Sequence, residues 1–160
     1  MSLSSRIAYT AGQIKQFYHR ISLPAVYRYE PGAISARVLD FPEDALAFLS
    51  ALQRYTLASV PFENLDLHYS QDHTVSIDPQ DLFEKVVERR GGEGGRGGYC
   101  MQTNALFGNV LRGLGFDVMA AGARVNAAAQ PSGGDSSSYS GWYSIPLALF
   151  LFYLMRSPCL

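Results

Sequence analysis

The chemistry that this sequence could support centres on Cys100, which ends the run Arg96-Gly97-Gly98-Tyr99-Cys100. An apolar-periodic segment from Met101 to Leu114 follows, so we expect Cys100 where a loop becomes a helix. The first turn of a helix has unpaired N–H groups and the positive end of the helix dipole, and both favour a thiolate, as does Arg96. Cys100 is therefore a candidate nucleophile. The alternative is a small buried side chain that packs as a hydrophobe.

A second polar candidate is Glu63, in the stretch Val60-Pro61-Phe62-Glu63-Asn64-Leu65. Its apolar neighbours Phe62 and Leu65 indicate a carboxylate at a buried place, and a buried carboxylate needs a partner. Arg96 is the expected partner, because a guanidinium suits paired hydrogen bonds to a carboxylate. A surface turn is the alternative.

The three histidines are His19, His68 and His73, and all precede Cys100. His19 lies beside an apolar stripe, and the other two lie in polar sequence. Structural or surface positions are favoured over catalytic ones. No histidine follows Cys100, and no acidic residue follows Asp135.

Composition limits the classes of protein. With 160 residues, 48% of them hydrophobic and 17% charged, the chain suits one globular domain. The net charge of −1 and the lack of a basic stripe give no support for nucleic-acid binding. Cys100 and Cys159 are too few and too far apart for a disulfide framework or a zinc site. A reducing, cytoplasmic location fits best, and no secretory signal is visible at the N-terminus.

The glycine-rich run from Gly91 to Gly98 is not expected to bind a nucleotide. It lacks the Lys-Ser/Thr ending of a phosphate-binding loop, and it follows an expected helix instead of a strand. We expect its glycines instead to let the backbone turn sharply and approach a ligand near Cys100.

Four helices are expected before residue 115. The first spans Ala11 to Ile21 behind a Thr10–Gln13 capping box, with Ile14, Phe17, Tyr18 and Ile21 on one face. The second begins after an Asp40 N-cap, turns Ala45, Leu46, Phe48, Leu49, Leu52 and Tyr55 inward, and ends near Leu57, before Pro61.

The third helix begins at an Asp78 N-cap with Pro79 next, and ends at Arg89 and Arg90 before Gly91. Its expected apolar face is Leu82, Phe83, Val86 and Val87. The fourth runs from Cys100 to Leu114, with Gly115 as its C-cap and with Ala105, Leu106, Val110, Leu111 and Leu114 inward.

The remaining chain is expected to contain little helix. Residues Phe116 to Val125 suggest a strand, and Asn126 to Gly141 suggest a flexible loop. The block from Tyr143 is almost unbroken apolar sequence, too short for a comfortable bilayer span of about 20 residues. A buried strand, or an unpacked apolar tail that promotes association, is favoured there over a membrane anchor.

Two stretches together resemble the arylamine N-acetyltransferases. One is Val60-Pro61-Phe62-Glu63-Asn64-Leu65. The other is Arg96-Gly97-Gly98-Tyr99-Cys100, continued by Asn104-Ala105-Leu106-Phe107 and by Leu114-Gly115-Phe116. Their order and their separation of about 35 residues also match the family, and the resemblance covers about residues 5 to 142.

The resemblance implies an α+β fold with the core of papain-like and transglutaminase-like thiol enzymes. Such chains contain an N-terminal helical bundle, then a β-barrel, then an α/β lid. On this mapping, residues 1–115 are the helical domain with the nucleophile, and residues 116–142 are the first strand and loop of the barrel. Residues 143–160 are an apolar tail without counterpart, and the rest of the barrel and the lid are missing.

The resemblance also implies a reaction. A cysteine takes an acetyl group from acetyl-coenzyme A, or another acyl group from its coenzyme A thioester, and passes it to an arylamine or arylhydrazine. Cys100 would be the nucleophile, Glu63 and Arg96 a structural ion pair beside it, and Phe62 and Tyr99 the substrate pocket. Acyl-coenzyme A is a co-substrate, and neither a bound cofactor nor a metal is implied.

The resemblance does not extend to the histidine and aspartate that complete the family's catalytic Cys-His-Asp triad. The family's histidine follows its cysteine by some 40 residues and its aspartate comes about 15 later, whereas this chain has neither. The expected histidine would fall near Trp142, so a truncated member, produced by a retained intron or a frameshift, is the hypothesis, with activity expected to be lost. The alternatives are a non-catalytic fragment that binds proteins, or itself, through exposed apolar surface, and another thiol enzyme such as a hydrolase.

Overall fold

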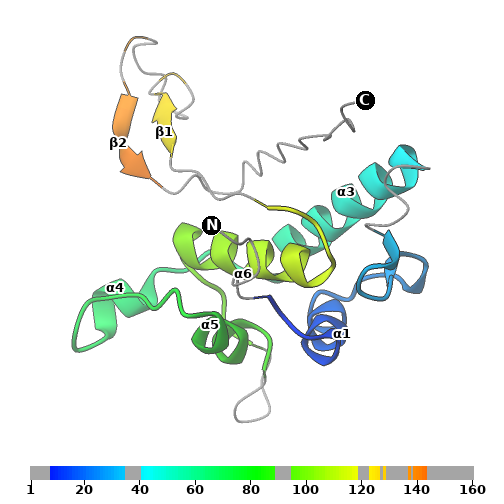
Figure 1. The fold of residues 1–160 in the computed structure, drawn as a ribbon. Helices are drawn as coiled ribbons and strands as arrows, with labels where there is room; N and C mark the ends of the chain where they lie inside the picture. The colour runs from blue at the N-terminus through cyan, green and yellow to red at the C-terminus, as the bar shows by residue number, and fades with distance from the viewer. Residues whose placement is uncertain are drawn as a thin grey trace, which may run out of the picture.

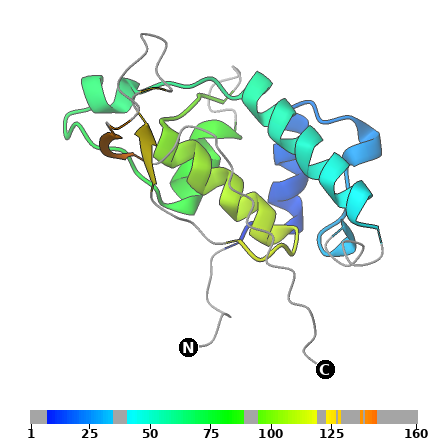
Figure 2. The same cartoon turned by 90° about the horizontal axis from the view of Figure 1, so that it is seen from above.

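The computed structural model describes residues 8–34, 41–88, 95–118, 123–126, 128, 137 and 139–143. The chain forms mainly helices, followed by two short strands (Figures 1 and 2). In order, the elements are α1 (Ala11–Arg20), η2 (Ala25–Tyr27), α3 (Pro42–Ser59), α4 (Leu65–Tyr69), α5 (Pro79–Val86), α6 (Cys100–Gly113), β1 (Ala123–Asn126) and β2 (Tyr139–Tyr143).

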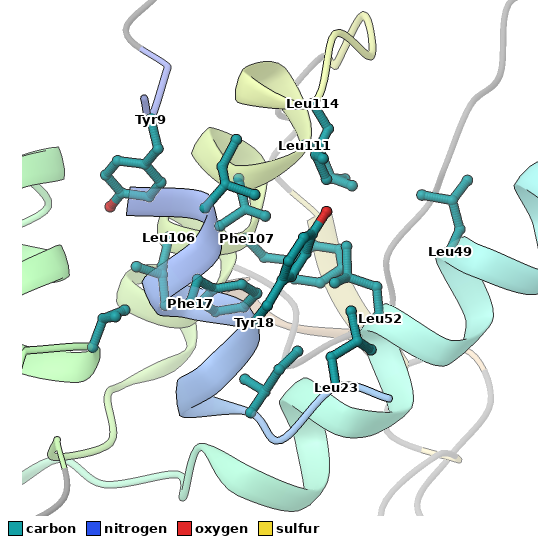
Figure 3. Close-up of a cluster of buried hydrophobic side chains, with 14 of the residues drawn as sticks. Tyr9, Phe17, Tyr18, Leu23, Leu49, Leu52, Leu106, Phe107, Leu111 and Leu114 are labelled. Atoms are coloured by element: carbon teal, nitrogen blue, oxygen red, sulfur yellow. The ribbon is translucent and has the colours of Figure 1, made fainter. Parts of the chain in front are cut away.

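The core lies where α6 meets α1, α3 and α5. Figure 3 shows side chains of α1, α3 and α6 converging on one apolar cluster. Its largest fully buried members include Phe17 from α1, Phe48 from α3, Phe83 from α5 and Phe107 from α6. Burial of each such side chain contributes roughly 1.5–3 kcal/mol, so this cluster is what holds the helices together.

Two of the expected helix starts are confirmed. Thr10 and Gln13 form the capping box of α1, in which each side chain bonds the other residue's backbone N–H. The Asp78 carboxylate accepts the N–H groups of Gln80 and Asp81, with Pro79 at the first position of α5. Both caps satisfy N–H groups that the helix itself leaves unpaired.

The expected start of α3 is wrong. Its N-cap is Phe41, without a side-chain cap, and Asp40 lies outside the described residues. Pro42 takes the first helical position, where its missing N–H costs nothing.

The α5 helix ends earlier than expected, at Val86, and Arg89 and Arg90 lie outside the described residues.

The inward face of α3 is confirmed except at one position. Ala45, Phe48, Leu49 and Leu52 are buried, and Tyr55 packs partly against the core. Leu46, expected inward, is 66% exposed. Leu46 therefore faces solvent, although Ala45 and Phe48 in the same turn are buried. The buried stripe of α3 is narrower than its apolar sequence suggests.

The end of α6 is a Schellman motif. Gly115 has φ of 93° and donates its N–H to Arg112 O, and Phe116 donates to Leu111 O. The Phe116 ring then stacks on Phe48, with centroids 6.5 Å apart. Residues 116–118 are therefore irregular chain anchored to the core, and the expected strand Phe116–Val125 is wrong in this part.

Strand structure begins later, at Ala123, and pairs with β2 in an antiparallel two-stranded sheet. The register places Ala123 opposite Tyr143 and Asn126 opposite Tyr139, with an irregularity between Arg124 and Asn126. Residues 139–141 were expected in a flexible loop, so that expectation is wrong there. After Tyr143, the residues of the expected apolar tail lie outside the described residues.

Within the described ranges, every helix is too short or too polar to cross a bilayer.

A paired truncation tests the core. Leu52→Ala, at a position 0% exposed, should lower the free energy of unfolding by about 2–5 kcal/mol because it leaves a cavity. Leu46→Ala on the same helix, at a position 66% exposed, should change it by about 0.5 kcal/mol or less. Urea titrations followed by circular dichroism measure both, and equal losses would contradict this packing.

Candidate active site

The two motif segments lie side by side, joined through their backbones. Phe62 and Gly98 form a parallel β-bridge. Gly98 N–H donates to Pro61 O, and Glu63 N–H donates to Gly98 O, both at 3.1 Å. Sequence-distant residues are thus held in one place, directly before the helix that Cys100 begins.

Gly97 makes this pairing sterically possible. A Cβ at position 97 would lie 1.8 Å from Pro61 O, far inside contact distance. The glycine is therefore required by close backbone approach and not by a positive φ. Gly95 is similarly confined, because its Cβ would lie 2.0 Å from Val86 O.

Arg20 of α1 fixes the start of the same segment. Its Nε donates to Val86 O and its Nη2 donates to Gly95 O, each at 2.9 Å. Arg96 N–H adds a bond of 2.9 Å to Lys85 O. The segment 95–98 is thereby tied to α1, α5 and residues 61–63. Sequence reasoning missed Arg20, for which the local pattern carries no signal.

Cys100 is the first residue of α6 and is 4% exposed. It is preceded by Tyr99 in an extended conformation, whose N–H donates to Gln102 Oε1 at 3.1 Å. The Thr103 hydroxyl lies 3.2 Å from Cys100 O. The predicted place for this cysteine, at the junction of loop and helix, is the place that the structure gives it.

Glu63 and Arg96 meet, but as members of a larger group. Glu63 Oε1 lies 3.2 Å from Arg96 Nη2 and 2.9 Å from Lys85 Nζ. Asp66 bonds the same two cations, with Oδ1 3.0 Å from Arg96 Nη2 and Oδ2 2.5 Å from Lys85 Nζ. We call Glu63, Asp66, Lys85 and Arg96 the Lys85 cluster. Two cations and two carboxylates make its charges balance.

Burial within the Lys85 cluster is unequal. The Arg96 side chain is 51% exposed, whereas those of Lys85 and Glu63 are 14% and 13% exposed. The more enclosed partner of Glu63 is therefore Lys85, which the sequence reasoning did not consider. Because solvent screens exposed pairs strongly, Lys85 contributes the stronger interaction.

The cluster also changes the acidity of Asp66. Hydrogen bonding by Lys85 is the largest cause that lowers the pKa of this carboxyl below its usual 3.8, and both cations add to it through their charge. Partial burial of Asp66 opposes the shift without reversing it. Asp66 therefore stays ionised to lower pH in the folded protein than in the unfolded chain.

Phe62 and Tyr99 contact each other above the backbone bridge. Their ring centroids are 5.6 Å apart, with the planes tilted by 49°. Phe62 is 57% exposed, and Leu65 and Met101 on the neighbouring segments are 46% and 42% exposed. Exposed apolar side chains are therefore present on both motif segments, next to the backbone bridge and in the first turn of α6.

The histidines are all exposed, which confirms the surface positions expected of His68 and His73. His68 Nε2 lies 3.1 Å from Asn64 Nδ2, and His73 Nδ1 lies 2.9 Å from Leu67 O. Among the contacts of the described residues, none joins a histidine to Cys100. A thiolate–imidazolium pair is thus not formed by these side chains.

A cavity of about 400 Å³ opens on the Lys85 cluster. Its lining includes Asp66, Lys85, Arg96 and Gln102, together with Asp81 and Glu84 of α5. Cys100 is not among the lining residues. The cavity therefore belongs to the ion cluster that supports the α6 N-terminus and not to the thiol itself.

Substitution of Gly97 tests the backbone pairing. Gly97→Ala should destabilise the protein by more than about 2 kcal/mol, because the new Cβ meets Pro61 O and the segments must separate. Gly12→Ala is the control. Its Cβ would find only Thr10 Oγ1, at 4.0 Å, so stability should rise by up to about 1 kcal/mol. If both variants unfold at the same urea concentration, the close approach is wrong.

The Asp66 interaction predicts a pH dependence of stability. Because its folded pKa lies below 3.8, the unfolded chain binds more protons near that pH, and the unfolding free energy falls as pH falls through and below 3.8. Asp66→Asn should reduce this slope between about pH 5 and the acid limit of the fold. Urea unfolding at a series of pH values measures the slope, and an unchanged slope in the variant would contradict the pairing.

The sequence matches a family model described as N-acetyltransferase over residues 45–138, more than half of the chain. The matched region includes both motif segments, the Lys85 cluster and the whole of α6. It also extends through β1.

Curated relatives agree with this match. The chain is 35% identical over 158 residues to an N-malonyltransferase, FDB2, of Gibberella moniliformis, a match that covers 92% of this chain and 43% of the relative. It is 39% identical over 84 residues to an arylamine N-acetyltransferase of Mycolicibacterium smegmatis, covering 52% and 28%. The liver isozyme of arylamine N-acetyltransferase from Gallus gallus is 34% identical over 77 residues, covering 48% and 24%.

The chain spans about two-fifths of the length of the fungal relatives. With the family match over more than half of its residues, and with both motifs paired before α6, this chain belongs to the arylamine N-acetyltransferase family.

Proposed function

We propose that the chain carries the nucleophile of an acyl-coenzyme A-dependent N-acyltransferase. Cys100 Sγ attacks the thioester carbonyl of the acyl donor, a new thioester forms on Cys100, and coenzyme A leaves as its thiol. An arylamine or arylhydrazine nitrogen then attacks this thioester. The amide forms, the amine loses a proton, and the Cys100 thiol is restored.

The observation that carries this proposal is the place of Cys100. It is a free thiol at the first position of a 14-residue helix, held by a backbone pairing between the two motif segments. The helix dipole and the first-turn N–H groups favour negative charge at that place. In this role the Lys85 cluster supports the thiol structurally, and Phe62 and Tyr99 offer an aromatic surface to the amine.

The acyl group need not be acetyl. The two fungal relatives, whose matches cover 92% and 84% of this chain, are named N-malonyltransferases. Both acetyl- and malonyl-coenzyme A are therefore donors to test, and both use the same thioester exchange at Cys100.

Proton transfer limits what these 160 residues can do by themselves. A paired imidazole is the usual means of activating a cysteine, and the histidines at 19, 68 and 73 are exposed and do not contact Cys100. We therefore propose that this chain alone accepts an acyl group slowly and does not turn over rapidly.

A second candidate function rests on the exposed apolar side chains of Phe62, Leu65 and Met101. Exposed apolar patches mark binding surfaces or sites of association. In this reading the chain binds a protein, or a second copy of itself, without catalysis. Sedimentation of the purified chain over a range of concentrations detects self-association.

Acylation of Cys100 tests the proposal. The chain is incubated separately with p-nitrophenyl acetate, acetyl-coenzyme A and malonyl-coenzyme A, and peptide mass mapping locates the adduct. We expect an adduct on Cys100 that an arylhydrazine removes, formed at least tenfold more slowly from the coenzyme A donors than from the activated ester. Cys100→Ser should form none, and Cys159 is the internal control.

Equal labelling of Cys100 and Cys159 would contradict a special role for Cys100. Rapid turnover of arylamine by this chain would support acyl transfer but would contradict the need for a paired histidine. Absence of any acyl adduct would favour the binding function.

A further inference from the structure

Lys85 connects the Lys85 cluster to α6 through a side-chain hydrogen bond to Gln102. Its ammonium has three N–H donors, and three acceptors surround it: Glu63 Oε1 at 2.9 Å, Asp66 Oδ2 at 2.5 Å and Gln102 Oε1 at 3.0 Å. The hydrogen-bonding capacity of this enclosed cation is thereby filled. A cation with such a set of partners fixes the positions of all three acceptors relative to one another.

Gln102 transmits this constraint to the start of α6. It is 2% exposed, and its Oε1 accepts from Lys85 Nζ and also from the N–H of Tyr99, at 3.1 Å. Its Nε2 donates to Ser76 O, also at 3.1 Å. The bonds to Lys85 and Ser76 therefore tie the first turn of α6 to two other segments, and the bond to Tyr99 closes that turn one residue before Cys100.

We propose that Lys85 is a positioning residue for Cys100. Lys85 holds the Gln102 side chain, Gln102 holds the backbone of Tyr99, and Tyr99 sets where Cys100 begins the helix. The inference rests on the proposed function in one respect, because the positioned thiol matters as the acyl acceptor. The arrangement itself can be measured without any acyl transfer.

Arg96 does not duplicate this role. Its Nη2 lies near both carboxylates of the cluster, so it already balances their charge from the exposed side. Among the contacts of the described residues, however, none joins Arg96 to Gln102. If Arg96 alone balanced the carboxylates, the Gln102 side chain and the first turn of α6 would have no hydrogen bond to the cluster.

Alkylation of Cys100 by iodoacetamide tests the proposal. Because Cys100 is 4% exposed, the reagent reaches its thiol when the first turn of α6 opens. Lys85→Met should accelerate alkylation of Cys100 about tenfold, the change expected from losing one charge-assisted hydrogen bond. Lys15→Met is the matched control. Lys15 is 59% exposed in a surface pair with Glu30, so the rate should stay within about twofold of that of the unmodified chain.

Hydrogen exchange separates positioning from general stability. In Lys85→Met, the amides of Tyr99 and Thr103 should exchange at least fivefold faster by NMR, whereas those of Val110 and Leu111 at the other end of α6 should not change. An unchanged alkylation rate would overturn the proposal. So would a rise in exchange that is equal at all four amides, because the effect would then be global unfolding.

Lys85→Met leaves two carboxylates with one cation, and this variant could unfold. The double variant Lys85→Met/Asp66→Asn restores charge balance with Arg96 and should give the same local effect at Tyr99 and Cys100. Acetylation of Cys100 by acetyl-coenzyme A, measured in parallel, should slow in both variants. Failure of the unmodified chain to accept an acyl group counts against the proposed function only, since alkylation and exchange still decide the role of Lys85.

Discussion

The site depends on one backbone pairing, between residues 61–63 and Gly98. Two hydrogen bonds of 3.1 Å join these segments, and they form because position 97 has no Cβ to strike Pro61 O. The pairing decides where Arg96 and Glu63 can meet and where the chain enters α6. Side-chain interactions then refine an arrangement that the backbone has already determined.

The electrostatics of the site follow from unequal burial. A lone carboxylate in the position of Glu63 would be costly, and two cations that contact its Oε1 offset that cost. The exposed cation, Arg96, contributes mainly charge. The enclosed one, Lys85, contributes fixed geometry, because it also bonds an amide whose other contacts lie in the first turn of α6. A balanced cluster of this kind can support the first turn of α6 without adding net charge of either sign.

The parts of the fold that sequence predicted are those that local interactions determine. The capping box at Thr10 and the N-cap at Asp78 use atoms within three residues of each other, so their signals are present in the sequence. Phe116 was misread because its apolar character was assigned to a strand, whereas the Schellman motif directs its ring into the helical core. Cys100, Arg96 and Glu63 were found from residue type and spacing. The sequence analysis missed Lys85, Asp66, Gln102 and Arg20. These residues come together from separate segments, and the periodicity of a single segment does not predict contacts between segments.

The parallel bridge between Phe62 and Gly98 also has a kinetic meaning. It closes a loop of about 35 residues, whose closure entropy is of order 3 kcal/mol by a logarithmic chain estimate. The helices before and after the segment 95–98, α5 and α6, form from local contacts, which are made faster than non-local pairings. The segment before Cys100 is therefore expected to dock late in folding, after α5 and α6 exist. A newly made chain would pass through a stage in which its helices are complete and its thiol is still open to solvent, so oxidants and electrophiles could reach Cys100 before the site has formed.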